Sequence, residues 1–444
     1  MRLKHTAFLL LCLCLPVLQH NAAAQTPGET QLGLDNAVKL ALENNLSLKK
    51  SEIDLAASGY SAKHLWSEIF PAINANTSLG YTSPLVSGDG FVYDDSGRRY
   101  TFGFGVSLGL NAGIPYSFKS IKLAHQSNLL RYEDACNQLS IQVTKKFYAL
   151  VAEKNNLSLL EEILNLAEKQ YERDQVSFRN GLVRELAVIQ SKLAVENARY
   201  NRSAAGTSYA NSMGEFLAML GMASDAETVL LGDINILKIE TDAEALIKQH
   251  LSGRPDIASA SREIERLEYA RKQSVLQGRA PSLSLSVDWN TAIIDPYTDS
   301  LSGTARLNIP IDTWIPGTAR SQSIGRAKDS VEKAKLDLAM TQDAAKNQIR
   351  SLAALLRNSW DSITIARLSL EAAQRGYELT EQGFNNGIVE SLALEDARNN
   401  MANARQRLLQ TELSYFNMIL DLSAALNVDW KDLIQAFGVP SEEK

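Results

Sequence analysis

Side chains that could carry acid–base or metal chemistry are sparse in this sequence. Beyond residue 24 the histidines are His64, His125 and His250, which are widely spaced and lie on predicted helices or their connections. A catalytic pair or a metal site needs such groups close together in the fold. We therefore interpret the three as ordinary surface or interface histidines, and we predict no catalytic residue, no metal site and no cofactor.

A glycine-rich stretch, Gly103-Phe-Gly105 with Gly109, has a weak likeness to a dinucleotide-binding loop. Such a loop follows a strand and opens a helix, so that the phosphates meet the helix N-terminus. These glycines instead lie inside one strand pattern, and no helix follows at the required spacing. We reject nucleotide binding and expect that the chain is not an enzyme.

The segment Tyr100–Asn111 alternates strictly between apolar residues and Thr, Gly, Ser or Asn. A period of two predicts a β-strand, because successive side chains point to opposite faces. Three further segments have the same character, which predicts β-hairpins over about 71–111 and 281–311. The residues expected on the apolar face of the two best-patterned strands are Phe102, Phe104, Val106, Leu108, Leu283, Leu285, Val287 and Trp289.

Four strands of about ten residues, each apolar on one face and small or polar on the other, are typical of an outer-membrane β-barrel. A sheet in hydrocarbon must close, because open edges would leave backbone groups without hydrogen bonds. Four strands are too few for closure, since membrane barrels start at about eight. We therefore expect several chains to share one barrel. A soluble β-sandwich with a glycine-rich solvent face is the alternative.

Two spans without proline, 116–254 and 317–439, are rich in helix-forming residues. A helix over 117–178 would be about 90 Å long at 1.5 Å per residue, which is too long for a compact domain. Apolar residues at steps of three and four predict narrow seams of coiled-coil packing. One such seam consists of Leu182, Leu186, Ile189 and Leu193.

Each helical span is broken once, at an Asn-Gly pair that is typical of a left-handed helix stop and a tight reversal. Each span is therefore predicted to fold into an antiparallel helical hairpin, with tips at 178–183 and 384–389. The tip residues that we single out are Phe178, Asn180, Gly181 and Val183 in the first hairpin, and Phe384, Asn386, Gly387 and Val389 in the second.

The two halves of the chain match at a shift of 206 residues, which pairs Phe178 with Phe384 and Gly181 with Gly387. We interpret this match as an internal duplication. The predicted domains are a first structural repeat over 25–222, a connecting segment over 223–253, a second repeat over 254–437 and a C-terminal tail over 438–444. Each repeat contains a helix, a β-hairpin and a long helical hairpin.

Residues 1–24 have the pattern of a secretory signal peptide, with a short basic start, an apolar run and Ala22-Ala23-Ala24. A transmembrane anchor is the alternative, although it would need a longer run of roughly 20 apolar residues. Removal of this segment leaves one cysteine, Cys136, which excludes a disulfide within one mature chain. The loss of Arg2 and Lys4 takes the formal net charge from −6 to −8, which does not favour nucleic-acid binding.

In this order of elements the chain, from about Leu34 to Phe437, resembles the TolC-like outer-membrane efflux and secretion channels. The likeness rests on the duplicated halves, the strand patterns and the repeated Phe-x-Asn-Gly-[Leu/Ile]-Val tips. It implies an α+β membrane fold, in which three chains give four strands each to a shared 12-stranded barrel. A hollow barrel of coiled-coil hairpins would continue through the periplasm.

The resemblance also implies a function and partners. The chain would be a trimeric outer-membrane channel-tunnel, the passive exit duct of a tripartite efflux pump or type I secretion system. Its partners would be two further copies, a periplasmic adaptor, an inner-membrane transporter and outer-membrane lipid. A membrane-anchored trimeric coiled-coil protein with a structural or adhesive role at the cell surface is the alternative.

In that family the helical tips close the periplasmic entrance and meet the adaptor, and the resemblance assigns these roles to the two tips named above. It also implies that acidic residues just past the second tip ring the pore. The candidates for that ring are Asp396, Glu395 and Glu390. A solvated helical face is the alternative interpretation of these carboxylates.

Overall fold

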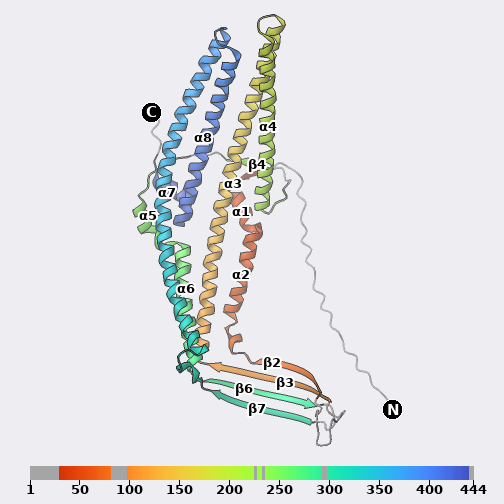
Figure 1. Cartoon of the computed structure of the whole chain (residues 1–444), viewed down its shortest axis with the longest axis vertical. Helices are drawn as coiled ribbons and strands as arrows, with labels where there is room; N and C mark the ends of the chain where they lie inside the picture. The colour runs from red at the N-terminus through yellow and green to blue at the C-terminus, as the bar shows by residue number, and fades with distance from the viewer. Residues whose placement is uncertain (1–29, 82–97, 225–227, 233–235, 293–297, 440–444) are drawn as a thin grey trace, which may run out of the picture.

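The computed structural model describes residues 30–81, 98–224, 228–232, 236–292 and 298–439 of the 444-residue chain. The molecule is elongated: long helices run side by side, and a four-stranded sheet projects from one end of them (Figure 1). The expected signal peptide lies outside the described residues, as does most of the loop within each predicted β-hairpin.

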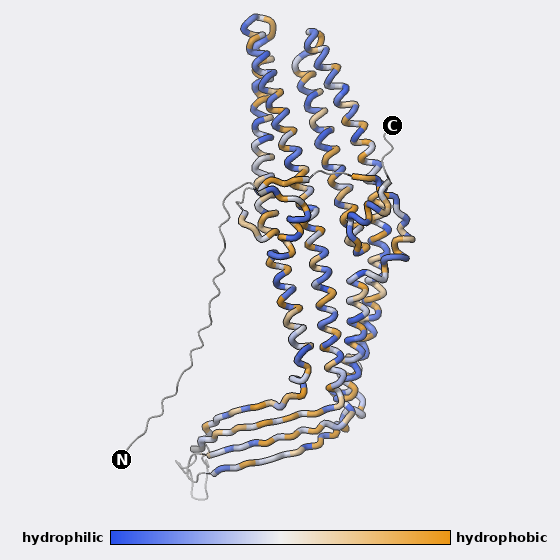
Figure 2. Tube along the Cα trace, turned by 180° about the vertical axis from the view of Figure 1, so that it is seen from behind, coloured by the Kyte–Doolittle hydropathy of each residue, from blue (hydrophilic) through white to orange (hydrophobic). Residues whose placement is uncertain are grey.

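The sheet consists of four antiparallel strands in the order β2-β3-β6-β7. Their bounds are β2 (Ala72–Tyr81), β3 (Arg98–Asn111), β6 (Ser282–Ala292) and β7 (Thr298–Asn308). The register places Ala75, Phe104, Trp289 and Leu301 side by side, so the apolar residues of all four strands share one face. Figure 2 shows hydrophobic and polar residues alternating along the strands, which confirms the period-two prediction.

Two very long helices start next to the sheet: α3 (Ile114–Arg179) and α7 (Ala319–Asn385). They contain 66 and 67 residues and therefore extend about 100 Å each. Each turns back into a second helix, α4 (Glu185–Met219) or α8 (Ser391–Leu426), to form a helical hairpin. Pro115 lies in the first turn of α3, where its missing N–H breaks no hydrogen bond.

Two shorter helices lie beside the long ones in the half nearest the sheet: α2 (Leu46–Lys63) and α6 (Pro255–Arg279). Contacts run from α2 to α3, from α3 to α6 and from α6 to α7, so the order of the helices repeats the order of the strands. Helices α2 and α7 are therefore the outer members of this layer. The short turns η1 (Leu65–Ile69) and η4 (Asp312–Trp314) join these two helices to the edge strands β2 and β7.

Short elements surround the middle of the long helices (Figure 1). Helix α1 (Leu34–Asn44) packs on α3, and β1 (Thr30–Gly33) pairs in parallel with β4 (Thr228–Leu231). Strand β5 (Lys238–Ile239) pairs with β8 (Gly438–Val439), the first two residues of the predicted tail. The remaining elements here are α5 (Ala243–His250), η3 (Leu251–Gly253) and α9 (Trp430–Phe437).

The two largest apolar clusters lie at this middle level, one in each repeat. The Tyr415 hydroxyl accepts a hydrogen bond from the Ile239 N–H (2.9 Å) and donates one to the Leu237 carbonyl (3.0 Å), which fixes β5 against α8. The main cores are thus distant from both the sheet and the tips. Their most buried large side chains include Phe147, Leu150, Phe216, Ile349, Tyr415 and Ile419.

The seam predicted over 182–193 is not packed within the single chain, so its coiled-coil packing stays a prediction. Its four apolar side chains are 57–76% exposed in the single chain. Helix α4 buries smaller residues in their place, because small side chains allow two helices to approach closely. The buried residues of this part of α4 are Ser191, Ala194, Val195 and Ala198. We call the exposed row the α4 stripe; it consists of Leu182, Leu186, Ile189 and Leu193.

Candidate functional site at the helical tips and the sheet

The first helical hairpin reverses through a left-handed glycine. Gly181 has a φ of +73°, and its N–H donates to the Phe178 carbonyl (2.9 Å) while the Leu182 N–H donates to the Ser177 carbonyl (2.8 Å). These two bonds form a Schellman cap, which satisfies carbonyl groups at the end of α3. Glycine adopts this conformation without the clash of a β-carbon. The Asn-Gly signal in the sequence therefore has a direct backbone cause.

The second hairpin repeats this geometry. Gly387 has a φ of +74°, its N–H donates to the Phe384 carbonyl (2.9 Å), and the Ile388 N–H donates to the Gly383 carbonyl (2.9 Å). Val389 folds over Gly383, where an added β-carbon would lie 2.7 Å from the valine Cγ2. The two tips thus have the same backbone structure at a shift of 206 residues, as the inferred duplication requires.

Both tips present apolar side chains to solvent. Leu182 and Ile388, which directly follow the two glycines, are 76% and 80% exposed. Each tip therefore combines a fixed backbone turn with an exposed branched side chain at the same place. Among the predicted tip residues, Phe178, Asn180, Gly181, Asn386 and Gly387 are exposed, and Val183, Phe384 and Val389 are half-buried.

Behind the tips, polar side chains lie between the two hairpins, and among them the sequence analysis identified Glu395 alone, as a pore candidate. Asp174 on α3 is 3% exposed and accepts a hydrogen bond from Gln170 (Nε2 to Oδ1, 2.8 Å). Arg398 on α8 is 8% exposed, and neither its Nε nor the Asp174 Oδ2 has a hydrogen-bond partner. Gln170 and Arg398 line a cavity of about 20 Å³, enough for one water molecule. We call Gln170, Asp174, Glu395 and Arg398 the polar seam.

Burial governs the charges in the polar seam. It raises the pKa of the Asp174 carboxyl, although Ser191 and Gln170 beside it act in the opposite direction. Burial also raises the pKa of Glu395, which the nearby Arg398 guanidinium partly offsets. Burial lowers the pKa of Arg398 itself. The charged form of each group is therefore less favourable here than in water.

The three acidic candidates past the second tip do not lie on one face. Glu390 and Asp396 are exposed, whereas Glu395 is half-buried in the polar seam near Arg398. Neighbouring residues on a helix point about 100° apart, so Glu395 and Asp396 cannot both face the same opening. Of the three acids, Glu390 and Asp396 are thus the exposed ones, and Glu390 is the N-cap residue of α8.

The apolar face of the sheet is the second candidate surface. All eight residues predicted for it share one side in the observed register. Five of them are exposed, Phe102, Phe104, Leu285, Val287 and Trp289, and three are half-buried, Val106, Leu108 and Leu283. The sheet therefore has a continuous apolar face that the described residues leave largely uncovered.

The opposite face of the sheet is less bare than its glycines suggest. Gly105 lies across from Asp288 and Gly103 across from Asn290. A β-carbon added at Gly105 would lie 2.5 Å from the Asp288 Oδ1. Polar side chains of the neighbouring strand thus fold over the glycines, which makes this face polar without bulk.

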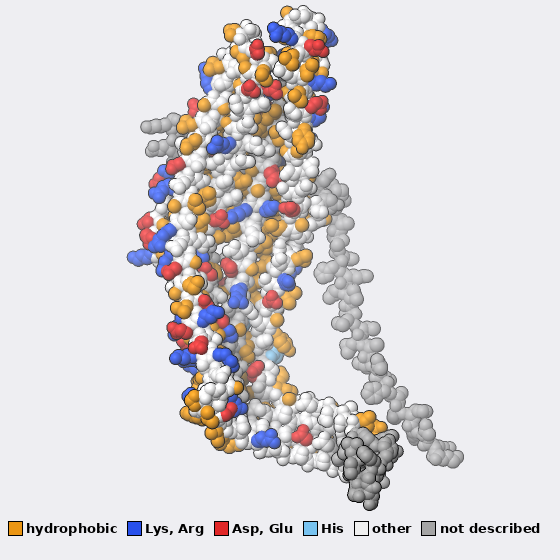
Figure 3. Space-filling view, viewed as in Figure 1, with side chains coloured by type: hydrophobic (Ala, Val, Ile, Leu, Met, Phe, Trp, Pro, Cys, Tyr) orange, Lys and Arg blue, Asp and Glu red, His pale blue; other side chains and the backbone are white. Residues whose placement is uncertain are grey.

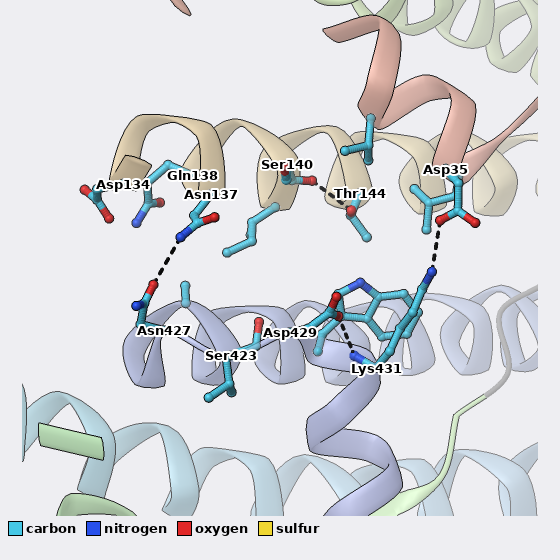
Figure 4. A pocket seen from close by; sticks show the side chains of 16 residues that line it. Asp35, Asp134, Asn137, Gln138, Ser140, Thr144, Ser423, Asn427, Asp429 and Lys431 are labelled. Carbon is cyan, nitrogen blue, oxygen red and sulfur yellow. Dashed lines mark hydrogen bonds and ion pairs between the residues drawn. The ribbon is translucent and has the colours of Figure 1, made fainter. Parts of the chain in front are cut away.

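A cavity of about 360 Å³ lies between α1, α3 and the corner of α8 and α9 (Figure 4). The Lys431 Nζ pairs with the Asp35 Oδ1 at 2.9 Å, and the Asn137 Nδ2 donates to the Asn427 Oδ1 at 3.1 Å. The Asp429 Oδ1 accepts a hydrogen bond from the Lys431 N–H (2.8 Å) and caps α9. Because these bonds connect the two repeats, we interpret the cavity as part of their junction.

The histidines lie in helical contacts. The His125 Nδ1 is 3.1 Å from the Ser58 hydroxyl, between α3 and α2, and the His64 Nδ1 is 2.8 Å from the Tyr60 carbonyl. Among the residues that the structure describes, no three His, Cys, Asp or Glu side chains gather as metal ligands would. In the same ranges, no helix combines the length and apolar character needed to cross a membrane.

Sequence comparison gives one family over most of the chain. The model of the outer membrane efflux protein family matches residues 37–222 and 246–428. The toluene efflux pump outer membrane protein TtgC of Pseudomonas putida is 24% identical over 438 residues, covering 94% of this chain and 88% of the relative. The probable efflux pump outer membrane protein SepC of the same species is 22% identical over 412 residues, covering 89% and 83%.

Solved structures with the same fold include two bacterial outer membrane proteins. The Campylobacter jejuni CmeC outer membrane channel superposes with a TM-score of 0.71 at 19% identity, covering 91% of this chain and 88% of its own. The outer membrane protein VceC of Vibrio cholerae gives a TM-score of 0.69 at 15% identity, covering 89% and 96%. The helical tunnel and β-barrel architecture expected from the sequence is therefore the fold of this chain.

Proposed function

The chain belongs to the outer membrane efflux protein family, and we propose that three copies form the passive exit duct of a tripartite efflux pump or type I secretion system. The sheet would lie in the outer membrane, and the helices would extend into the periplasm. The relatives TtgC and SepC carry the names of efflux pump outer membrane proteins. The observation that carries the proposal is a sheet with one uncovered apolar face and two open edges.

Closure of the barrel explains the open edges. Among the described residues, β2 and β7 each pair with a strand on one side only, so each forms an edge of the sheet whose backbone N–H and C=O groups have no neighbouring strand. Such groups cannot remain unpaired in hydrocarbon. Pairing of β7 with β2 of the next chain removes every edge once three chains have joined, giving twelve strands from three sets of four.

The helical layer supports the same assembly, because its outer helices α2 and α7 adjoin the same two edge strands. On α2, Leu46, Ile53 and Tyr60 are exposed at intervals of seven residues, which places them on one face of a coiled-coil helix. On α7, Leu336 and Met340 are exposed one turn apart. We propose that these two rows pack together between neighbouring chains and continue the barrel as a helical tube.

The tips supply the proposed contact with the periplasmic adaptor. Leu182 and Ile388 occupy equivalent places in the two repeats, so a trimer would carry six similar tips in one ring. A partner with a repeated apolar surface could bind all six. The α4 stripe continues this apolar surface from the first tip, and we assign it to contacts beyond the single chain, either with the adaptor or with the next copy.

Charge at the entrance comes from the exposed acids. Asp396 lies nine residues past Gly387, about 13 Å along the helix axis. Three-fold symmetry turns one carboxylate per chain into a ring of three, which attracts cations and repels anions. We propose Asp396 for this ring, with Glu390 nearer the rim. Glu395 does not belong to it, because it lies in the polar seam.

The alternative of a surface adhesin fits the chain less well. An adhesin stalk needs no second hairpin, whereas this chain carries two hairpins with equivalent tips. Recording in planar lipid bilayers separates the two functions. We expect the purified protein to form discrete ion-conducting channels. An inserted protein that conducts no ions would contradict the duct and favour the adhesin.

A further inference from the structure

We infer that the outer side of the helices next to the sheet binds anionic phospholipid head groups of the inner leaflet of the outer membrane. This inference rests on the proposed function, because it requires the sheet to lie in the bilayer. The inference goes beyond that function, because it names the class of lipid that is bound and the residues that bind it. Three independent observations support it: the local charge, a cluster of lysines on a tyrosine, and the apolar residues beside them.

Positive charge gathers at the end of the helices that meets the sheet. We count the ten residues nearest the sheet in each of the helices α2, α3, α6 and α7, and add the turns η1 and η4. Together these residues contain nine Lys and Arg but three Asp and Glu. The whole chain has a formal net charge of −6, so this end carries the opposite sign from the rest. We call this region the basic collar; a trimer would carry it three times around the barrel.

The centre of the basic collar is a pair of lysines on one aromatic ring. The Lys119 Nζ and the Lys272 Nζ lie 5.2 and 5.4 Å from the centre of the Tyr269 ring. Lys119 also lies 5.8 Å from the ring of Tyr116. A phosphate beside this ring would be attracted by both ammonium groups.

Lys119, and Lys122 one turn further along α3, point away from the proposed duct. Lys122 and Lys119 precede Val143 and Ser140 by three heptads each, and residues seven apart share a face in paired helices. Val143 is buried in the cluster that contains α1, and Ser140 lines the cavity next to α1. Both lysines are exposed. Helix α1 cannot lie inside the duct without blocking it, so this side of the layer is the outer one.

The basic collar adjoins exposed apolar residues at the point where the helices meet the sheet. The Arg279 guanidinium lies 5.1 Å from the ring centre of Trp314, which is exposed. Ile309, Ile311 and Ile315 beside it are also exposed. Figure 3 shows hydrophobic side chains at the corner where the helices meet the sheet, with charged side chains of both signs, Lys and Arg among them, on the helices above. Aromatic residues beside basic residues are typical of a membrane interface.

The test is lipid selection by the intact trimer. We would incubate the purified protein in mixed micelles with equal amounts of phosphatidylglycerol and phosphatidylethanolamine, recover the trimer, and measure the ratio of the two lipids bound. Each basic residue near a membrane surface contributes a factor of about five at low salt. We expect wild-type protein to retain phosphatidylglycerol at least about fivefold over phosphatidylethanolamine.

The variant Lys119→Gln/Lys272→Gln/Arg279→Gln should lose this preference, whereas Lys119→Arg/Lys272→Arg should keep it. The matched control is Lys154→Gln/Lys169→Gln/Lys192→Gln, which removes three exposed lysines far from the sheet and should behave as wild type. An equal loss in this control, or no preference in wild-type protein, would overturn the inference.

Inorganic phosphate separates a lipid site from a site for free anions. If phosphate at the same concentration abolishes the preference, the lipid assignment is wrong; we expect no change. Bilayer conductance of the same samples separates this inference from the proposed function. Conducting trimers without lipid preference contradict the inference alone, and protein that forms neither trimers nor channels contradicts both.

Discussion

Gly181 and Gly387 lie 206 residues apart and adopt nearly the same left-handed conformation, with φ values of +73° and +74°. Gly221 and Asn427, which also lie 206 residues apart, end α4 and α8 with φ values of +71° and +55°. The duplication therefore extends to the backbone of all four helix ends. Asparagine replaces glycine at one of them, as its tolerance of this conformation allows.

The first prediction concerns the two tip glycines. Gly181→Ala and Gly387→Ala should each destabilise their tip by about 1 kcal/mol, because a β-carbon is unfavourable at positive φ. No heavy atom outside the local backbone lies within 4 Å of either added carbon, so crowding plays no part. Hydrogen exchange of the amides around 178–183 and 384–389 would measure the loss.

The matched control for the tips is Gly325→Ala and Gly376→Ala. Both residues lie inside α7 and have equally open surroundings. Alanine favours a helix over glycine, so these changes should be stabilising by roughly 0.5–1 kcal/mol. If both pairs of variants lost the same hydrogen-exchange protection at the tip amides, positive φ would not be the cause of the destabilisation.

The second prediction concerns the two faces of β3. Phe104→Arg should prevent or slow membrane insertion, because Arg on the lipid side of a barrel costs about 2–4 kcal/mol near the midplane. Ser107→Arg introduces the same side chain on the opposite face and should be tolerated. Gly105→Ser should be close to neutral, provided that the Asp288 side chain moves aside. The measurement is the yield of assembled protein in outer-membrane fractions, and equal losses in the two Arg variants would reverse the assignment of the faces.

The third prediction concerns pH and the polar seam. Burial raises the folded-state pKa of Asp174 above its ordinary value of 3.8. Asp174 therefore adds to the free energy of unfolding fully at pH values below 3.8, where its carboxyl is protonated. This contribution is lost as the pH rises through the pKa of Asp174 in the folded state. Asp174→Asn should stabilise the hairpins near pH 7, by up to roughly 1–3 kcal/mol, and this gain should disappear in acid.

Chemical unfolding at several pH values, followed by helical circular dichroism, would measure the gain from Asp174→Asn. The charged group that acts on Asp174 is Arg173 on its own helix, which lowers the pKa of Asp174 against the effect of burial. The control Asp337→Asn removes the same charge from an exposed site on α7 and should change stability by less than about 0.5 kcal/mol. Destabilisation by Asp174→Asn at neutral pH would contradict the prediction.

The fourth prediction concerns the entrance. Asp396→Asn should lower the cation selectivity of single channels, because it removes the proposed ring of three charges. Glu390→Gln should have a smaller effect, since Glu390 lies nearer the rim, and Glu395→Gln should have little, since Glu395 is half-buried. The reversal potential in a salt gradient measures the selectivity. A shift in Glu395→Gln with none in Asp396→Asn would mean that the helix presents another face to the pore.

Much of the fold follows from local patterns. The strands follow from strict alternation, the tips from Asn-Gly pairs, and the long helices from the absence of proline, and each signal needs few neighbours in the sequence. The α4 stripe shows the limit of this reasoning. Apolar periodicity indicates that a helix has an apolar face, but it does not indicate which partner covers that face. In α4 the smaller residues Val195 and Ala198 lie against α3 instead.

Asp174 and Arg398 of the polar seam were not predicted from the sequence, for a related reason. Asp174 continues the seam spacing of Leu164, Ala167 and Tyr171, and Arg398 lies four residues from both Leu394 and Ala402. A charged residue at a seam position is a usable signal in principle. The role of such a residue depends on where the second hairpin lies. That position is fixed by contacts in the middle of the molecule between residues far apart in the sequence. The hydrogen bonds of Tyr415 to Leu237 and Ile239, at separations of 178 and 176 residues, are an example.

The central claim is that three chains share one barrel through the edges of β2 and β7. The molar mass of the detergent-solubilised protein, measured by light scattering with the detergent mass subtracted, tests this claim most directly. We predict a single species of three mature chains, because one chain leaves the edges of β2 and β7 open and the family resemblance implies three copies. A stable monomer that keeps its full β-strand content in circular dichroism would contradict the account.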